Sequence, residues 1–171
     1  MLEIREIKVK LFRYKKNLYP QLIKGGNATK YITPFAKEFC DGEGLDIGGL
    51  ESCTFPNATP INITINDKYH ALKLPSKKYD FIFSSHCLEH INEPISKVLS
   101  YWKTRLKKNG TLFLYLPHND MEYWHPNNNK KHKHNIFEED IVIILKSIGY
   151  KDIVCSKRDL YWSFSVIGFN K

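Results

Sequence analysis

The chain has 171 residues, of which 42% are hydrophobic and 26% charged, and its formal net charge is +8. These fractions are typical of a globular protein, and the length suits a single domain with a substantial core. No apolar run approaches the roughly 20 residues of a transmembrane helix, and the first residues alternate charged with apolar side chains instead of forming a signal-peptide core. We therefore expect a cytoplasmic protein without a transmembrane segment.

The positive charge raises the question of a nucleic acid or an anionic membrane as partner. Nearly all of it comes from lysine, and the arginines are limited to Arg5, Arg13, Arg105 and Arg158. Arginine is the side chain that binds bases and phosphates through two parallel hydrogen bonds. Nucleic acid is therefore not expected as a partner. Anionic small substrates and a function close to a membrane surface remain open.

Residues 1–30 carry apolar side chains at helical spacing, with basic residues between them. The apolar positions are Ile4, Ile7, Leu11, Tyr14 and Leu18, and they predict a helix. Three roles stay open for this segment: packing on the domain, covering a substrate cleft as a lid, or lying on a membrane surface. We expect an N-terminal arm or lid over residues 1–30 and the main domain over residues 31–171.

A threonine followed by a proline predicts the start of a short helix over residues 33–40. Residues 45–47 then form a short buried strand, and Gly48 and Gly49 follow it. Glycines at a strand end let the backbone approach a ligand that a Cβ atom would push away. Residues 60–64 are predicted as the next strand.

The central part of the chain begins with an apolar run over residues 81–83, which predicts a buried strand. Polar Ser84, Ser85 and His86 follow at its carboxyl end. A helix capped by Asn92 or Glu93 is predicted next, since apolar side chains recur on one face at Ile95, Val98, Leu99, Trp102 and Leu106.

Gly110 has the residue type that ends a helix, and residues 111–116 predict a second buried strand that Pro117 ends. Strand, helix and strand in this order are typical of a parallel sheet. Ligands bind at the carboxyl edge of such sheets, which is where the polar residues after each strand lie.

A loop over residues 122–134 contains His125, His132 and His134. No Asp, Glu or Cys joins these histidines at the usual ligand spacing, so no metal site is predicted.

Asn135 and Glu138 form a variant of the capping box before a helix that Gly149 ends. Residues 152–156 and 161–169 are predicted as an antiparallel strand pair, with Asp159 in the turn between them.

Three segments together resemble class I S-adenosylmethionine-dependent methyltransferases, in particular small members of the methyltransferase type 11 kind. They are Leu-Asp-Ile-Gly-Gly (45–49), Tyr-Asp-Phe-Ile-Phe-Ser-Ser-His-Cys-Leu-Glu-His (79–90) and the helix ending Leu-Lys-Lys-Asn-Gly (106–110), which runs into a strand ending in proline. The resemblance implies an α/β fold: a three-layer Rossmann-like sheet, mostly parallel, with an antiparallel C-terminal strand pair. The short segment after residue 49 predicts that the first crossover helix is missing, and the short segment after residue 64 predicts that the second helix and one strand are missing, so the glycine-loop side is reduced.

The resemblance also implies S-adenosylmethionine as the cofactor. By position, the residues expected to bind it are Asp46, Gly48, Gly49, Asn62, Asp67, Ser84 and Ser85. Asn62 stands where the family usually has an acidic residue, and its amide has only one acceptor oxygen for the ribose hydroxyls.

The function that follows is methylation of an oxygen or nitrogen of a small-molecule or glycan-precursor acceptor. His86, His118 and His134 are the candidate catalytic residues, because histidine exchanges protons near neutral pH, whereas Glu89 and His90 are expected to fix their turn. The Leu-Pro-His segment and the later His-Lys-His segment resemble methyltransferases of polysaccharide biosynthesis, and Tyr123 and Trp124 are expected to line the acceptor site. The alternative is a non-catalytic scaffold module that partners another methyltransferase, and a homodimer also remains open.

Overall fold

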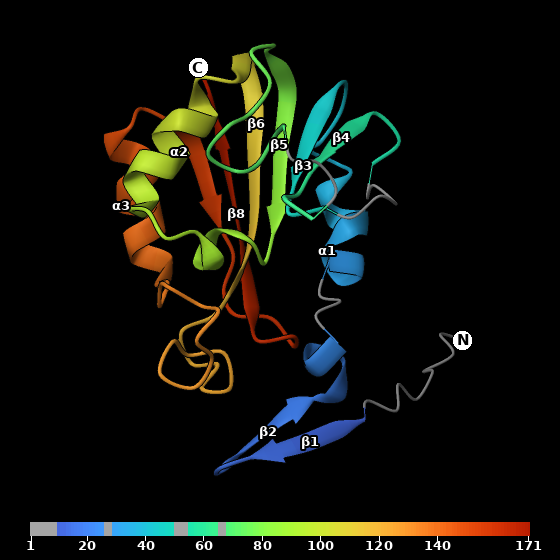
Figure 1. Cartoon of the computed structure of the whole chain (residues 1–171), viewed down its shortest axis with the longest axis vertical. Coiled ribbons are helices and arrows are strands. Elements are labelled where there is room, and N and C mark those ends of the chain that lie inside the picture. The colour runs from blue at the N-terminus through green and yellow to red at the C-terminus, as the bar shows by residue number, and fades with distance from the viewer. Residues whose placement is uncertain (1–9, 26–28, 50–54, 65–67) are drawn as a thin grey trace, which may run out of the picture.

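The computed structural model describes residues 10–25, 29–49, 55–64 and 68–171. They form a six-stranded sheet in the order β4-β3-β5-β6-β8-β7 and a separate hairpin of β1 and β2 (Figure 1). The strands are β1 (Leu11–Tyr14), β2 (Asn17–Pro20), β3 (Gly44–Ile47), β4 (Ala58–Ile61), β5 (Tyr79–Ser85), β6 (Leu106–Pro117), β7 (Lys151–Cys155) and β8 (Ser163–Phe169).

The first four strands of the sheet run parallel, and β8 and β7 are antiparallel to their neighbours. The registers pair Ile47 with both Ile61 and Ser84, and pair Ser85 with Tyr115. The carboxyl ends of β3, β4, β5 and β6 therefore meet at one edge of the sheet. The predicted fold class, a mostly parallel Rossmann-like sheet with an antiparallel C-terminal pair, is confirmed.

Helices cover both faces of the sheet: α2 (Ile95–Lys103) and α3 (Glu138–Ser147) lie on one face and α1 (Thr29–Ala36) on the other (Figure 1). Side chains alternate between the faces along each strand. Ile82 and Leu112 pack in the core under α2 and α3, whereas Phe81 and Phe113 pack in the core that includes the end of α1. This alternation produces the three layers.

The glycine-loop side of the sheet is reduced, as predicted. The described residues between β3 and β4 contain no helix, and those between β4 and β5 contain only turns and an isolated bridge between His70 and Lys73. The sheet consequently ends at β4 within the described part of the chain. In that same part, no helix is long and apolar enough to span a membrane.

The predicted N-terminal helix is wrong over residues 11–20. Ile4 and Ile7, the first two positions of the predicted helix, lie outside the described residues. Residues 11–20 form the β1–β2 hairpin, and the 3-10 helix η1 (Gln21–Gly25) follows. Phe12 pairs with Tyr19 across the hairpin, and both are buried against Trp124. Contacts with aromatic residues distant in the sequence thus outweigh the local helical spacing.

Several predicted boundaries also shift. Helix α1 starts at Thr29 and contains Pro34, and the predicted strand at 60–64 is β4 at 58–61. Helix α2 ends at Lys103 because Leu106 is fully buried and pairs with Tyr79 as the first residue of β6, so Gly110 lies inside a strand. The expected caps are replaced by Pro94 and Phe137, whose side chains accept no capping hydrogen bond from the helix amides.

Candidate functional site

Two cavities lie at the carboxyl edge of the sheet. The first, which we term the glycine-side cavity, has a volume of about 440 Å³ and is lined by residues that include Gly48, Asn62 and Leu72. The second, the loop-side cavity, has a volume of about 520 Å³ and is lined by residues that include Tyr123 and Trp124. His86 and His90 line both cavities, so the two spaces adjoin at these histidines.

Gly48 and Gly49 are required by close packing at the end of β3. Gly48 has a φ of +93°, and a Cβ atom there would lie 2.7 Å from the Cβ atom of Cys87. A Cβ atom on Gly49 would lie 2.5 Å from the carboxyl carbon of Asp46, which is buried in β3. Glycine alone therefore lets β3, the β5 turn and Asp46 come together here.

Asn62 holds this glycine turn in place. Its side-chain nitrogen donates to the Gly48 carbonyl oxygen at 3.3 Å, and its side-chain oxygen accepts from the Thr64 amide and hydroxyl. Asn62 thus lines the glycine-side cavity with its amide already engaged, and Asp67 lies outside the described residues.

Ser84 and Ser85 connect neighbouring segments. The Ser84 hydroxyl donates to the Ile47 carbonyl oxygen at 3.0 Å, and the Ser85 hydroxyl accepts from Thr29 at 2.9 Å. Of the described residues predicted to bind the cofactor, Gly48 and Asn62 line this cavity, whereas Asp46, Gly49, Ser84 and Ser85 do not.

His86 has a left-handed backbone, with φ of +48°, directly after β5. Its Nε2 atom lies 3.0 Å from the Ser163 hydroxyl, and its Nδ1 atom lies 3.7 Å from Oε1 of Glu89. Burial, followed by the neighbouring His132 and His90, lowers the pKa of His86 to about 3. The imidazole is consequently neutral near pH 7 and presents one lone pair.

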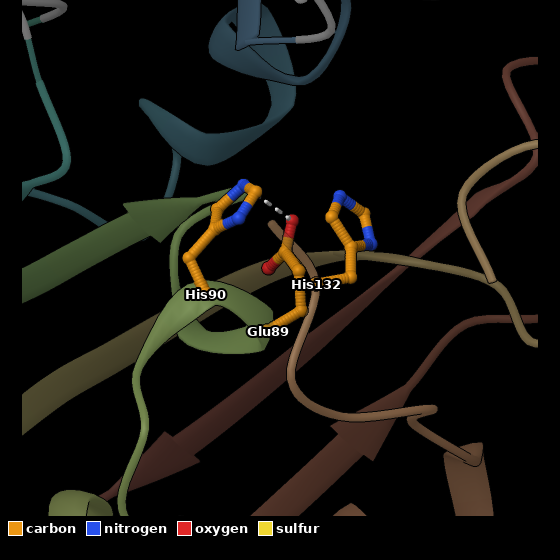
Figure 2. A group of neighbouring side chains, drawn as sticks. All are labelled: Glu89, His90 and His132. Carbon is orange, nitrogen blue, oxygen red and sulfur yellow. Dashed lines mark ion pairs between the residues drawn. The ribbon is translucent and has the colours of Figure 1, made fainter. Parts of the chain in front are cut away.

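Glu89 is the middle residue of the 3-10 turn η2 (Leu88–His90) and is completely buried, and burial raises its pKa to about 8. Neither carboxylate oxygen has a hydrogen-bond partner with good geometry within the described residues, and only the backbone amide of Glu89 itself opposes the rise in pKa. Figure 2 shows the carboxyl group between the imidazoles of His90, on the same turn, and His132, on the loop that passes beside it. The ligating atoms of the three side chains all lie within 4.8 Å of one another.

This cluster was not predicted from the sequence, because the spacing of the histidines within the loop does not connect them to residues 89 and 90. His132 lies 42 positions beyond His90, and only the packing of the loop against η2 brings them together. The burial of Glu89 would have indicated the cluster. A carboxyl group that is shielded from water needs a partner, and two histidines lie beside this one.

His118 and His134 lie apart from both large cavities. The Nδ1 atom of His118 accepts from the Asp120 amide at 3.1 Å, and Nε2 of His134 donates to the Ile91 carbonyl oxygen at 2.8 Å. Both residues line a void of about 10 Å³, which has room for no more than about one water molecule. Their catalytic roles stay predictions.

Comparisons with known proteins identify the class of domain. A family model described as a methyltransferase domain matches residues 25–154, so the chain belongs to this methyltransferase family. The comparison with curated proteins gave no match.

Solved structures with similar folds include an S-adenosylmethionine-dependent methyltransferase from Archaeoglobus fulgidus, with 16% identity, a TM-score of 0.64 and coverage of 84% of this chain and 93% of that chain. The N-methyltransferase NodS from Bradyrhizobium japonicum, in complex with S-adenosyl-L-homocysteine, has 12% identity and a TM-score of 0.60, covering 86% and 87%. A complex of the Haloferax volcanii Trm112 methyltransferase activator with a protein assigned as a methyltransferase has 10% identity and a TM-score of 0.63, covering 87% and 93%. Identities this low show likeness of fold.

Family membership supports S-adenosylmethionine as the cofactor, as the sequence predicted. The glycine-side cavity fits such a group, because its volume lies within the roughly 300–1,000 Å³ of small-molecule sites. Its wall includes apolar Ile61, Ile63 and Leu72 together with the polar side chain of Asn62. This lining suits a ligand with an aromatic base and a hydroxylated sugar.

Proposed function

We propose that the chain transfers a methyl group from S-adenosylmethionine to a small-molecule or glycan-precursor acceptor. The cofactor would lie in the glycine-side cavity and the acceptor in the loop-side cavity. The observation that carries this proposal is the shared wall, because His86 and His90 line both spaces. Methyl transfer needs a donor and an acceptor held in line across such a junction.

The lining of the loop-side cavity favours a polar, ring-containing acceptor. Tyr123 and Trp124 offer aromatic faces, and Asn128 and Asn129 offer amide donors and acceptors. A sugar presents apolar C–H faces and hydroxyl groups together, which matches this combination. Lys24 and Lys131 also line the cavity and would favour an anionic group on the acceptor, such as a phosphate.

The bound cofactor supplies an activated methyl group on its sulfonium. The residues of this chain then have two tasks, which are orienting the acceptor and excluding water. We assign His86 to the first task, because its neutral imidazole directs Nδ1 toward Glu89 beside the junction and can accept a hydrogen bond from an acceptor hydroxyl or amine. Trp124 packs edge-on against the His86 ring at 4.7 Å and limits its orientation.

The N-terminal segment is assigned to the second task. Tyr14, Ile23 and Lys24 line the loop-side cavity, and Lys15 forms an ion pair of 2.6 Å with Glu122 on the loop. The described part of this segment, residues 10–25, would thus act as the lid over the acceptor, which is one of the three roles that the sequence left open.

Calorimetric titration with S-adenosylhomocysteine tests the cofactor assignment. We expect saturable binding by the wild-type chain and at least about tenfold weaker binding by Ala71→Trp, a loss of about 1.4 kcal/mol, because the indole would fill the glycine-side cavity. Leu160→Trp is the matched control, since Leu160 is 84% exposed and lines neither cavity. Thermal melts of both variants verify folding.

Two results would contradict the proposal. Absence of binding at millimolar S-adenosylhomocysteine would favour the alternative scaffold module, and the search would turn to a methyltransferase partner. Equal weakening by both tryptophan variants would place the ligand elsewhere. With binding established, release of S-adenosylhomocysteine from S-adenosylmethionine in the presence of single sugars, sugar phosphates and amines tests the acceptor class.

A further inference from the structure

We propose that Glu89, His90 and His132 bind a divalent transition-metal ion in the wall of the loop-side cavity. All three residues line that cavity, and their ligating atoms lie within 4.8 Å of one another. Glu89 and His132 are buried, whereas His90 is partly exposed. Two imidazoles and one carboxylate are a ligand set that zinc and other transition metals use.

The hydrogen bonds around the cluster leave imidazole lone pairs facing the carboxyl group of Glu89. Nδ1 of His90 lies 3.0 Å from the Lys131 carbonyl oxygen, and a carbonyl only accepts, so the proton of the neutral ring is on Nδ1. The Nε2 atom therefore presents a lone pair, and it faces Oε1 of Glu89. Such a backbone bond to the far nitrogen is the usual way in which a metal-binding histidine is oriented.

His86 adds a second lone pair facing the same oxygen. The Ser163 hydroxyl donates to the Tyr161 carbonyl oxygen at 3.2 Å, which leaves it to accept from Nε2 of His86. Nδ1 of His86 is then unprotonated and lies 3.7 Å from Oε1 of Glu89. Acceptors that face one another in a buried place repel unless a proton or a metal ion lies among them.

The spacing of the acceptors is that of ligands rather than of hydrogen-bond partners. Nε2 of His90 lies 3.7 Å from Oε1 of Glu89, which is beyond hydrogen-bond range. Two atoms that each lie about 2.1 Å from one zinc ion at a tetrahedral angle are about 3.4 Å apart. The gap between these two atoms is close to this value, and with all three ligating atoms within 4.8 Å of one another a metal ion would fit after a small adjustment of side chains.

Backbone contacts hold the two ligand segments together. The amides of Lys133 and His134 both approach the Glu89 carbonyl oxygen, at 2.7 and 3.3 Å. The His134 ring donates to the Ile91 carbonyl oxygen. The loop that carries His132 is therefore bonded to η2 and to the residue that follows it, and little ordering is needed when a metal binds.

The role of the metal toward the acceptor rests on the proposed function. Three protein ligands leave a fourth position of zinc open, and the cavity is the open side of this cluster. A hydroxyl oxygen of the acceptor that occupied this position would lose its proton to solvent more readily. Its lone pair would then take the methyl group while the sulfonium of the donor becomes a thioether, so that charge and atoms balance. This assigns a hydroxyl as the methylated group.

Titration of the chelator-treated full-length chain with zinc chloride tests the site. We expect one zinc ion per chain, and Glu89→Gln, His90→Ala and His132→Ala should each weaken binding by about a hundredfold or more, at least as much as loss of an outer hydrogen bond to a ligand. His125→Ala is the matched control, because this histidine is on the same loop and outside the cluster. Cobalt as a spectroscopic probe should give the absorption bands of a tetrahedral site in the wild type and in His125→Ala.

Absence of zinc binding to the wild-type chain would overturn the proposal, as would zinc binding that all four variants retain. Glu89→Gln keeps the side-chain shape, so it remains informative if an alanine variant fails to fold. S-adenosylhomocysteine binding, measured without metal, is the separate readout of the proposed function. Its presence without zinc binding would refute the metal site alone, and its absence beside zinc binding would refute the methyltransferase assignment alone.

Discussion

At the scale of single residues, Glu89 combines full burial with a lack of hydrogen-bond donors. A glutamine in its place could turn its side-chain NH₂ group toward the lone pairs of His86 and His90, which both face Oε1. We therefore expect Glu89→Gln to raise the free energy of unfolding of the metal-free chain by about 1–2 kcal/mol. Chemical denaturation in the presence of a chelator measures this change.

Zinc should reverse the order of stability of the wild type and Glu89→Gln. A ligand that binds only the folded state stabilises it, so saturating zinc should raise the melting temperature of the wild type and leave that of Glu89→Gln nearly unchanged. A Glu89→Gln chain that is less stable than the wild type without metal would show that the carboxyl group has partners of its own.

Asp80 gives a pH-dependent prediction on the opposite edge of the sheet. Hydrogen bonds from Lys107, and then from the Glu43 amide, lower the pKa of Asp80 below its usual range. Because the folded-state pKa is depressed, this stabilisation is complete above the unfolded pKa of about 3.9 and is lost as the pH falls through the folded pKa. Asp80→Asn should therefore destabilise the chain more at pH 7 than at pH 2.5.

The size of this effect is limited by solvent. The side chains of Asp80 and Lys107 are 37% and 46% exposed, so we expect a difference below about 1 kcal/mol after screening. Urea unfolding of the wild type and Asp80→Asn at both pH values checks it. A difference that does not shrink in acid would contradict the ion-pair origin.

Residue types in the sequence predicted which segments meet at the site but not how single side chains act there. Gly48 and His86 were identified from their place after buried strands, and both reach the cavities. Ser84 and His134 were also identified, yet their polar groups bond to backbone carbonyls. Hydrogen-bond partners depend on segments distant in the chain, and no local pattern encodes them.

At the scale of elements, the β1–β2 hairpin is held by one aromatic cluster. Tyr19 is fully buried with Met121 and Trp124 from the loop after β6, and its ring packs edge-on against Trp162 at 4.7 Å. We expect Tyr19→Ala to destabilise this packing by about 3–5 kcal/mol. Tyr19→Phe retains the ring and should cost less than about 1 kcal/mol.

Hydrogen exchange distinguishes a lid from an integral part of the domain. If the hairpin opens independently, Tyr19→Ala should speed the exchange of amides in residues 11–20 while those of β5 and β6 keep their protection. Uniform loss of protection in all three places would show that the hairpin and the sheet unfold together.

Element boundaries were predictable where burial follows a simple period. The runs at 45–47 and 81–83 are buried on both faces and became β3 and the centre of β5. The start of β6 was assigned to the preceding helix because Leu106 continues the spacing of Trp102 and Val98. Where a buried residue fits both the helical and the strand period, its tertiary partner determines its secondary structure. For Leu106 this partner is Tyr79.

At the scale of the whole molecule, the fold follows from the order of the strands and helices along the chain and from the segments that connect them. Four parallel strands, of which β5 and β6 are joined by α2, bring their carboxyl ends to one edge, and the sequence predicted this edge together with the reduced glycine-loop side. The hairpin and the loop after β6 were unpredictable in position, because they pack on each other and not on a periodic element. The loop-side cavity is formed largely by these two parts, so its shape could not be derived from the chain alone.

The two cavities share His90, and this predicts an energetic coupling between their ligands. Zinc would fix the His90 ring, which also lines the glycine-side cavity, so S-adenosylhomocysteine would bind to a wall that is already ordered. We expect saturating zinc to tighten S-adenosylhomocysteine binding by about fivefold, and S-adenosylhomocysteine to tighten zinc binding by the same factor, as linkage requires.

Calorimetry in both orders of addition measures the two factors, and their equality is an internal check. The Glu89→Gln variant should lose the zinc dependence, because its weakened metal site no longer fixes His90. His125→Ala should retain it, because this residue lies outside the cluster. If zinc binds at one ion per chain but leaves the S-adenosylhomocysteine affinity unchanged, the two sites are energetically independent and His90 is only a wall between them.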